Sequence, residues 1–529
     1  MAHGVVLVGG VVAATVLIIG AKLFSIILRK RPGPLPPGPK GLPLVGNIRD
    51  LPADGDREWE HWLKHKDVYG PISSVTALGS TIVIIHSAEL ALRLLDKKTS
   101  IYSSRPSPPF AELTGWSGVV GLLSDPYEHR VRRGLVHPYL GTPKAIKPYL
   151  PLQEKETHRL LFRILQDPEP FEDHTRITAA SIILNMVYGY TVEPHKTDPL
   201  VTLADEALAQ FSAATVPGAW LVDLIPSMMY IPDWLPGAGW KRTGKKWRAC
   251  LMETIEKPLR FAQQQISKGH SKESFVSGYY DKKGETISPQ DIDTLKWIAV
   301  SIYTAAADTT VNTITAFFLA MTLFPEVQRK AREEIDRVIG TGRLPMYSDR
   351  PSLPYIDAVI SEAWRWHAVT PMALPHKTSV DDFVDGYFIP KGSVVMANVW
   401  WFMHDPETYP DPSTFNPSRF LGPNPEPDPL NHIFGYGRRI CPGRYLANTS
   451  VWLMIARSLA VFDISKGLDE NGREIEPTVQ FMPGIISRAA PFKATIKPRS
   501  PQHEALIRQV EEIYPWEKGD SDKLSEIVI

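Results

Sequence analysis

The chain of 529 residues has very few cysteines and no net charge. Cys250 and Cys441 are its only two cysteines, which excludes a disulfide framework and a zinc site built on cysteine pairs. Lysine and arginine total 58, and aspartate and glutamate also total 58, so the chain has no basic footprint and we expect no nucleic-acid partner. The sequence has no glycine-rich phosphate loop, so we expect no nucleotide to bind this chain directly.

The N-terminal segment differs from the rest of the chain. Residues 5–21 are an unbroken run of apolar and small residues, and apolar residues continue past Lys22 to Leu28. About 20 apolar residues span a bilayer core. The basic residues 29–31 follow the run, whereas a cleavable signal peptide has its basic residues before the run. The pattern predicts that residues 1–31 are a retained, single-pass transmembrane anchor with the remainder of the chain in the cytosol.

The remainder divides into two parts. Residues 32–48 are rich in proline and glycine and predict a stiff hinge, with a disordered spacer as the alternative. Residues 49–529 form one large domain, in which long helical patterns dominate and short strand patterns are rare. This predicts a mainly α fold with small β-sheets. The patterns used are helices over residues 292–321, 326–338 and 353–367, and strands over residues 82–85 and 393–396.

One of the two cysteines lies in an unusual setting. Phe434, Gly437, Arg439, Cys441 and Gly443 fall within ten residues. Glycine allows positive φ and close approach to a flat ligand, and the cation suits an anionic edge. A lone thiolate on such a loop can bind a metal that takes its other ligands from a cofactor, as in haem. The alternative is a buried structural cysteine beside a turn.

This run resembles the haem-binding signature of the cytochrome P-450 superfamily at all five positions. The resemblance implies a cytochrome P-450 fold for residues 49–529, heme b (iron protoporphyrin IX) as the cofactor and Cys441 as its iron ligand. With its expected N-terminal anchor, the chain resembles the class II microsomal members of the superfamily. Residues 483–488 and 491–493 are similar to fungal members related to O-methylsterigmatocystin oxidoreductase.

The glutamate–arginine pair Glu362 and Arg365 lies one helical turn apart in an apolar helix. Alone, such a pair is typical of a solvated surface. With Arg419 downstream, it resembles the Glu-x-x-Arg helix and the later arginine motif of the superfamily. The resemblance implies that Glu362, Arg365 and Arg419 form a buried ionic triad with a structural role.

Asp308 and Thr309 lie in the middle of the long apolar helix. Threonine can bond back to the preceding turn, so a satisfied kink in a core helix is one explanation. The resemblance implies the other, an acid–alcohol pair that delivers protons during oxygen activation. Ala306 stands where the superfamily usually has glycine, a departure that narrows the expected groove.

The propionates of a haem need cationic partners, and the resemblance assigns this role to Arg439 and His376. A third partner usually lies in a Trp-x-x-x-Arg pattern on an early helix. Residues 127–133 supply cations without the tryptophan, and we assign Arg130 or Arg132. The alternative for this cluster is a solvated basic face that attracts an acidic partner.

The resemblance implies a haem-thiolate monooxygenase that inserts one oxygen atom from O2 into an apolar small molecule, in secondary metabolism or xenobiotic oxidation. NADPH-cytochrome P-450 reductase is the implied electron donor, with cytochrome b5 as a second donor, at the endoplasmic reticulum membrane. The alternatives are a desaturase or isomerase of the same superfamily and a non-enzymatic membrane haem-binding protein. The expected pocket lining is residues 119–123, 211–216, 305, 485 and 486.

Overall fold

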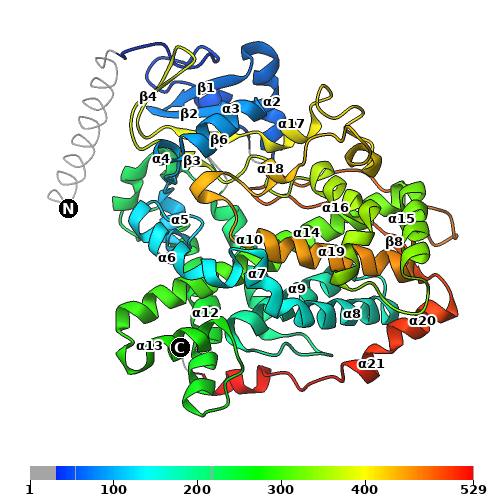
Figure 1. The fold of residues 1–529 in the computed structure, drawn as a ribbon. Coiled ribbons are helices and arrows are strands. Elements are labelled where there is room, and N and C mark those ends of the chain that lie inside the picture. Colours follow the sequence, from blue (N-terminus) through cyan, green and yellow to red (C-terminus); the bar gives the residue numbers. More distant parts are fainter. Residues whose placement is uncertain (1–30, 54, 216–218, 528–529) are drawn as a thin grey trace.

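The computed structural model describes residues 31–53, 55–215 and 219–527, and it is mainly helical with three small sheets, as predicted (Figure 1). The predicted N-terminal anchor falls almost wholly on residues 1–30, outside the described residues. Within the described ranges, no single helix has the length and apolarity needed to cross a membrane. One pair, α14 (Pro289–Leu323) and α15 (Pro325–Val338), meets that test jointly but is bent by 104°.

The largest sheet has the strand order β1-β2-β6-β3, and its strands are Ile72–Ala77, Ser80–Ile85, Val394–Ala397 and His376–Lys377. Strand β2 pairs antiparallel with β1 (Ser74 opposite Val83) and parallel with β6 (Ile84 opposite Met396). Two antiparallel sheets of two strands each pair β4 (Asp382–Val384) with β5 (Tyr387–Ile389) and β7 (Phe462–Lys466) with β8 (Ala494–Pro498).

The proline-rich segment 32–48 lies against this sheet. Pro37 O accepts from Ser74 N at 2.8 Å, and Pro36 O accepts from the Ser74 hydroxyl at 2.6 Å. Pro34 O accepts from Phe388 N on β5 at 2.7 Å. Proline carbonyls remain strong acceptors although the ring nitrogen donates nothing, so residues 34–37 dock on the domain through their carbonyls. The end of the segment also donates, because Asn47 N bonds to Thr76 O at 2.7 Å.

Helix α14 is the central helix of the domain. Ser288 and Asp291 form a reciprocal capping box at its start, and Pro289 occupies its first turn, where a proline costs no hydrogen bond. Side chains around most of its circumference are buried, which is typical of an interior helix. It packs against α9 (Phe171–Tyr188), α12 (Gly239–Ser267) and α19 (Arg444–Val461).

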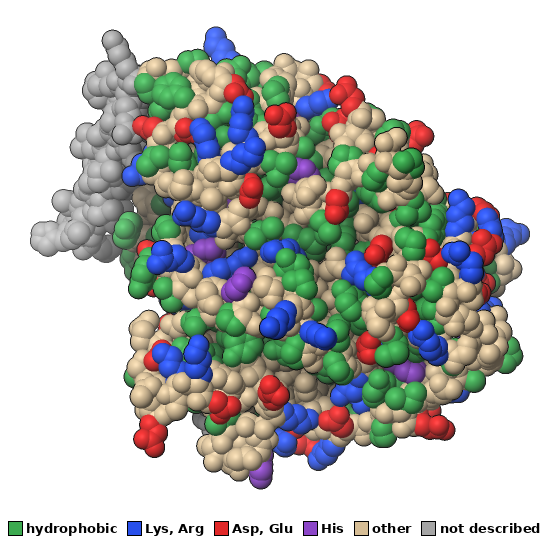
Figure 2. All heavy atoms as spheres, in the orientation of Figure 1, with side chains coloured by type: hydrophobic (Ala, Val, Ile, Leu, Met, Phe, Trp, Pro, Cys, Tyr) green, Lys and Arg blue, Asp and Glu red, His purple; other side chains and the backbone are tan. Residues whose placement is uncertain are grey.

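The other helices surround this centre, and acidic and basic side chains are interspersed over the face shown in Figure 2. Their bounds are α2 Glu58–Tyr69, α3 Ala88–Ala91, α4 Thr99–Tyr102, α5 Pro109–Leu113, α6 Pro126–Leu140, α7 Pro143–Ile146, α8 Leu150–Gln166, α10 Pro199–Thr215, α11 Leu221–Leu224, α13 Phe275–Lys283, α16 Pro354–Trp366, α17 Val399–His404, α18 Leu430–Ile433, α20 Pro501–Arg508 and α21 Val510–Ile513.

Candidate cofactor site around Cys441

The loop before α19 holds Cys441 in a tight turn. The Cys441 amide donates to Phe434 O at 2.8 Å and closes the loop. Gly437 has a φ of +51°, and a Cβ there would lie 2.6 Å from Thr99 Oγ1 and 2.7 Å from Leu95 O. Both the backbone conformation and the space therefore require glycine at this position.

Two further contacts fix the loop to its surroundings. The Gly437 amide donates to Asp96 Oδ1 at 2.9 Å. The Phe434 ring packs edge-to-face against Trp364 of α16, with ring centroids 5.6 Å apart. At Gly443 a Cβ would lie 3.9 Å from Cys441 Sγ, so glycine here leaves the space beside the sulfur open. The sequence therefore positions one thiol with little freedom.

The two cysteines have different electrostatic environments. Burial raises the pKa of the Cys441 thiol, while the Gly443 amide and the cations Arg133 and Arg444 act in the opposite direction. Burial raises the pKa of Cys250 to about 11, and the carboxylates Glu206 and Glu253 act in the same direction. Two cations and a backbone amide therefore favour a thiolate at Cys441, whereas at Cys250 the two carboxylates outweigh the opposing effects of Gln210 and Lys246.

Arg439 lies two residues before the cysteine and is buried. Its Nε donates to Ser103 O at 2.6 Å and its Nη2 to Leu123 O at 2.7 Å. Its Nη1 is buried and has no partner among the described residues. Burial, assisted by Arg133, lowers the pKa of Arg439 to about 10. A buried guanidinium nitrogen without an acceptor costs free energy unless a ligand supplies one.

His376 and Arg105 lie beside Arg439. His376 Nδ1 is 2.6 Å from Tyr102 O, and burial and the Arg105 charge hold the pKa of His376 well below its usual value. Arg105 donates through Nη1 to Leu374 O and Pro375 O at 2.6 and 2.8 Å. Burial and the Arg439 charge lower the pKa of Arg105 to about 9. Sequence reasoning missed Arg105 because it comes from an irregular segment with no helical or strand pattern.

On helix α6, the structure brings His129 and Arg133 to the site in place of Arg130 and Arg132. Arg130 is exposed. Arg132 donates to Gly118 O at 2.7 Å and pairs with Glu128 at 3.0 Å. Burial and the neighbouring arginines, Arg439 first, lower the pKa of His129 to about 3. His129 and Arg133 have the four-residue spacing of the Trp-x-x-x-Arg pattern, with histidine at the tryptophan position, and this spacing was the available signal.

These side chains make a basic cluster, which we define as Arg105, His129, Arg133, His376 and Arg439. Within the described part of the chain, none of the five forms an ion pair with a carboxylate, and burial is the largest cause of the lowered pKa of each. Three arginine charges close together in a largely buried site are unfavourable without an anion. The unpartnered Nη1 of Arg439, the excess positive charge and the adjacent lone thiol fit a flat cofactor with two carboxylates and a metal centre, which is the chemistry of haem.

The acid–alcohol pair lies on α14. Thr309 donates its hydroxyl proton to Ala305 O at 2.9 Å, the bond expected of a threonine within a helix. Asp308 Oδ1 lies 3.5 Å from Arg176 Nη1 of α9. Arg176 also contacts Asp205 of α10 at 3.4 Å, and burial raises the pKa of Asp205 to about 6, an effect that the Asp308 charge adds to. Asp308 is thus connected through one guanidinium to a second carboxylate.

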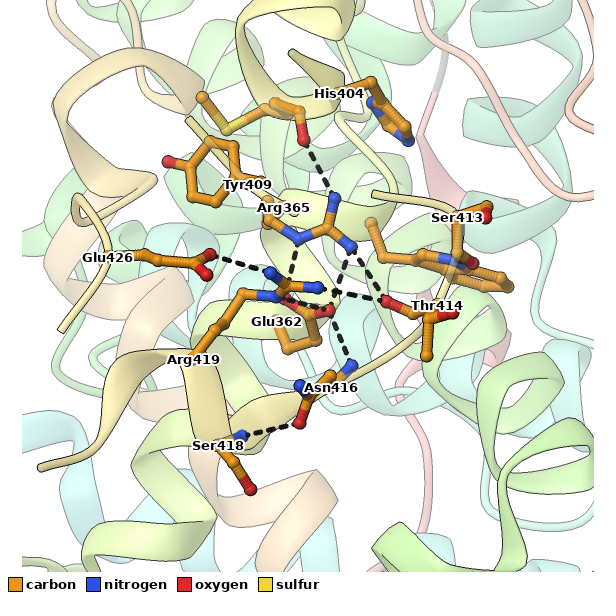
Figure 3. Close-up of polar contacts among 12 residues, drawn as sticks. Glu362, Arg365, His404, Tyr409, Ser413, Thr414, Asn416, Ser418, Arg419 and Glu426 are labelled. Carbon is orange, nitrogen blue, oxygen red and sulfur yellow. Dashed lines mark hydrogen bonds and ion pairs between the residues drawn. The ribbon is translucent and has the colours of Figure 1, made fainter. Parts of the chain in front are cut away.

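Glu362, Arg365 and Arg419 meet in the interior, as Figure 3 shows. Glu362 accepts from Arg365 Nε at 2.7 Å and from Arg419 Nε at 3.2 Å, and the Glu362 and Arg365 side chains have no exposed surface. Arg365 Nη1 donates to Met403 O at 2.8 Å, and Asn416 N donates to Glu362 at 2.7 Å. These bonds fasten the segment before the cysteine loop to α16.

The structure describes most of the residues that were expected to line the substrate pocket. The Phe211 and Trp116 rings lie 4.7 Å apart. Val119 and Val120 belong to the same apolar cluster as Phe211, and Ile485 and Ile486 pack against it. Ala305 is exposed, and its neighbour Ala306 packs against this cluster instead. Leu123 lies beside Arg439 through its carbonyl. Residue 216 falls outside the described residues.

Comparison with known proteins bears on this site. The family model for cytochrome P-450 matches residues 36–494. The chain is 46% identical to the cytochrome P-450 monooxygenase claR of Ampulloclitocybe clavipes, over 92% of this chain and 90% of that protein. It is 41% identical to the multifunctional cytochrome P-450 monooxygenase af510 of Aspergillus fumigatus, over 94% of each. It is 36% identical to O-methylsterigmatocystin oxidoreductase of Aspergillus flavus, over 96% and 97%.

These matches cover nearly the whole chain at identities that share fold and general chemistry. The expected haem cofactor and oxidoreductase class are therefore confirmed. The loop around Cys441, the basic cluster beside it and the central helix α14 are all within the matched residues. The chain belongs to the cytochrome P-450 family.

Proposed function

We propose that the protein is a haem-thiolate monooxygenase in which Cys441 is the iron ligand and the substrate is an apolar small molecule. The observation that carries the proposal is the pairing of a half-buried thiol on a tight loop, Cys441, with a basic cluster that has no carboxylate partner among the described residues. When bound, the haem supplies the chemistry that activates O2 and transfers one oxygen atom. The protein's part is to hold the cofactor, exclude water and deliver protons.

The basic cluster holds the cofactor's carboxylates. Arg439 Nη1 is available for a charge-assisted hydrogen bond, which is stronger than a neutral one. Arg133 and Arg105 add charge from α6 and from the segment before α5, and His376 adds a ring nitrogen from β3. Because these three arginines and His376 come from four separate segments, binding the cofactor also ties these segments together.

Asp308 and Thr309 of α14 handle protons. The Thr309 hydroxyl can rotate away from Ala305 O, and Oγ1 can then donate its proton and accept another. Asp308, held by Arg176, is the nearest acid in sequence and can resupply that proton. An isomerase that rearranges a substrate peroxide needs no such relay, so this pair favours oxygen insertion over isomerisation.

The remaining assignments follow the family pattern. We assign the electron supply to NADPH-cytochrome P-450 reductase, with cytochrome b5 as a second donor, and residues 1–31 to a single-pass anchor in the endoplasmic reticulum membrane. A role in secondary metabolism agrees with the similarity to O-methylsterigmatocystin oxidoreductase.

Isotope labelling tests the reaction class. Membranes containing the protein and its reductase are screened with apolar compounds for a substrate-induced shift of the Soret band, and positive compounds are then incubated with NADPH and ¹⁸O2. We expect one ¹⁸O atom per product molecule, and no product without the reductase. A product that has lost hydrogen but gained no ¹⁸O would favour the desaturase alternative, and a product oxygen drawn from water would contradict the proposal.

A further inference from the structure

The last part of the described chain runs along the outside of the domain beyond the residues that the family model matches. We call residues 499–527 the C-terminal strap. It begins where Arg499 N donates to Val461 O at 2.9 Å, and it passes through α20 and α21 (Figure 1, red). His158 Nε2 of α8 is 3.0 Å from Leu506 O. The strap then continues along the lower edge of the view toward α12.

Trp516 anchors the strap on α8. Its ring lies 4.6 Å from the Arg159 guanidinium and 5.4 Å from that of Arg163. Arg159 Nη2 also donates to Pro515 O at 3.0 Å. Cation–π contacts strengthen when they are desolvated, and both arginines are buried. Helix α8 packs on α9 and α19, so this end of the strap is attached to the rigid core.

A second group of contacts holds the segment between α9 and α10. Asp520 N donates to Thr191 O at 2.9 Å, and Thr191 N donates to Asp520 Oδ2 at 2.8 Å. Ser521 N donates to Glu193 Oε1 at 3.1 Å. A Cβ on Gly519 would lie 2.3 Å from Glu193 Cδ. The strap and this segment therefore fit closely and share one backbone–backbone hydrogen bond and two bonds from backbone amides to carboxylates.

That segment leads directly into α10. Asp198 is buried and accepts from the Tyr190 hydroxyl at 2.9 Å and from Glu193 N at 3.0 Å. It also accepts from Leu200 N, in the first turn of α10, at 2.9 Å. Because Asp198 joins both sides, the contacts at Thr191 and Glu193 fix the position at which α10 begins.

A third group of contacts holds the end of α12. Glu517 pairs with Lys272 at 3.1 Å, just beyond that helix, and Glu526 pairs with Lys268 at 3.3 Å. Leu524 is buried in the same apolar cluster as Phe261 of α12. Exposed pairs contribute little singly, so the buried leucine is the stronger of these contacts.

Helices α10 and α12 pack against each other and against α14. Asp205 of α10 reaches Asp308 through Arg176. From this arrangement we infer that the C-terminal strap is a latch. It fastens the outer ends of α10 and α12 to α8 and limits their movement away from α14, and so it slows the passage of ligands to the site beside Asp308. The inference rests on the proposed function only in placing a haem site there.

The test compares the holoprotein with Trp516→Ala, and with Glu511→Gln as a control at an exposed position on the same strap. Hydrogen exchange is measured by peptide. In Trp516→Ala we expect exchange in residues 190–215 and 245–272 to be about tenfold faster, with α14, α16 and α19 unchanged. We also expect faster association of 4-phenylimidazole, followed at the Soret band. Glu511→Gln should match the parent in both measurements.

Unchanged exchange in those two segments, or equal acceleration in α16 and α19, would overturn the inference. If Trp516→Ala gives too little holoprotein, Asp520→Ala replaces it, because it removes only the Thr191 and Lys523 contacts. The exchange measurement does not depend on how the haem is held. A failure of the proposed function would instead appear as a parent protein with no ligand-induced Soret change.

Discussion

The ionic triad and the basic cluster are two buried charged groups with opposite balance. In the triad, Glu362 faces two arginines, and Arg419 has a second carboxylate, Glu426, at 2.7 Å. In the basic cluster, cations face cations, and Arg439 Nη1 has no partner among the described residues. The triad is complete within the chain, whereas the cluster is completed only by an anionic ligand.

The difference shows that a buried charge with a counter-charge in the chain has a structural role, whereas a buried charge without one is available to bind a ligand. Burying either group has an unfavourable desolvation free energy. In the triad, hydrogen bonds within the chain offset it, so removing a triad residue should affect folding. In the cluster, a bound ligand offsets it, so removing a cluster residue should affect cofactor retention first.

The largest effect is expected at the triad. Glu362→Ala leaves Arg365 buried without a counter-charge and leaves Arg419 with Glu426 as its remaining carboxylate. Removing one partner of a buried pair costs about 3–5 kcal/mol. We expect little folded, haem-loaded protein, measured as haem per protein after purification. Arg329→Ala, which removes an exposed pairing on α15, should change the free energy of unfolding by about 0.5 kcal/mol or less. Equal haem content in both variants would show that the Glu362 ion pairs contribute no more to stability than an exposed salt bridge.

A smaller effect, of a different kind, is expected at the basic cluster. Arg133→Met removes a cation that faces the site, and Arg130→Met removes an exposed cation from the same helix. Losing a charge-assisted interaction of about 1.5–3 kcal/mol should speed haem transfer to apomyoglobin about 10- to 100-fold in Arg133→Met only. Equal transfer rates in the two variants would indicate that these residues of α6 form a solvated basic face and do not bind the haem.

Thr309→Ala should leave both charged groups intact, because Thr309 contacts neither. Haem content should therefore equal that of the parent protein. A loss of about 2 kcal/mol in proton delivery corresponds to about a 30-fold change in partition, so we expect less product per NADPH and more hydrogen peroxide. Asp308→Asn should act in the same direction. Unchanged coupling in both variants would reduce the pair to a kink in α14.

The smallest effect is expected at Arg132, which lies next to the cluster but bonds within the chain. Arg132→Met loses its bonds to Gly118 O and Glu128, so the free energy of unfolding should fall by about 1 kcal/mol, measured by denaturant titration. Haem transfer should be unchanged. Faster haem transfer from Arg132→Met than from Arg133→Met would reverse the register proposed for α6.

Sequence patterns predicted what depends on local spacing. The long helix with Asp308 and Thr309, the pairing of Glu362 with Arg365, and the helical fold follow from periodicity and motif. The orientation of α6 does not, because a short basic run gives no clear apolar face. Arg105 was missed for a related reason: its role depends on carbonyls of Gly121 and Leu374, which only the tertiary fold brings to it.

The most direct test of the account is the reduced carbon monoxide difference spectrum of two matched cysteine variants. Cys441→Ser should lose the thiolate Soret band, because its sulfur is the proposed iron ligand. Cys250→Ser should retain the band, because that thiol is buried in α12 beside carboxylates. A Cys441→Ser protein that keeps the band, with Cys250→Ser losing it, would contradict the central claim.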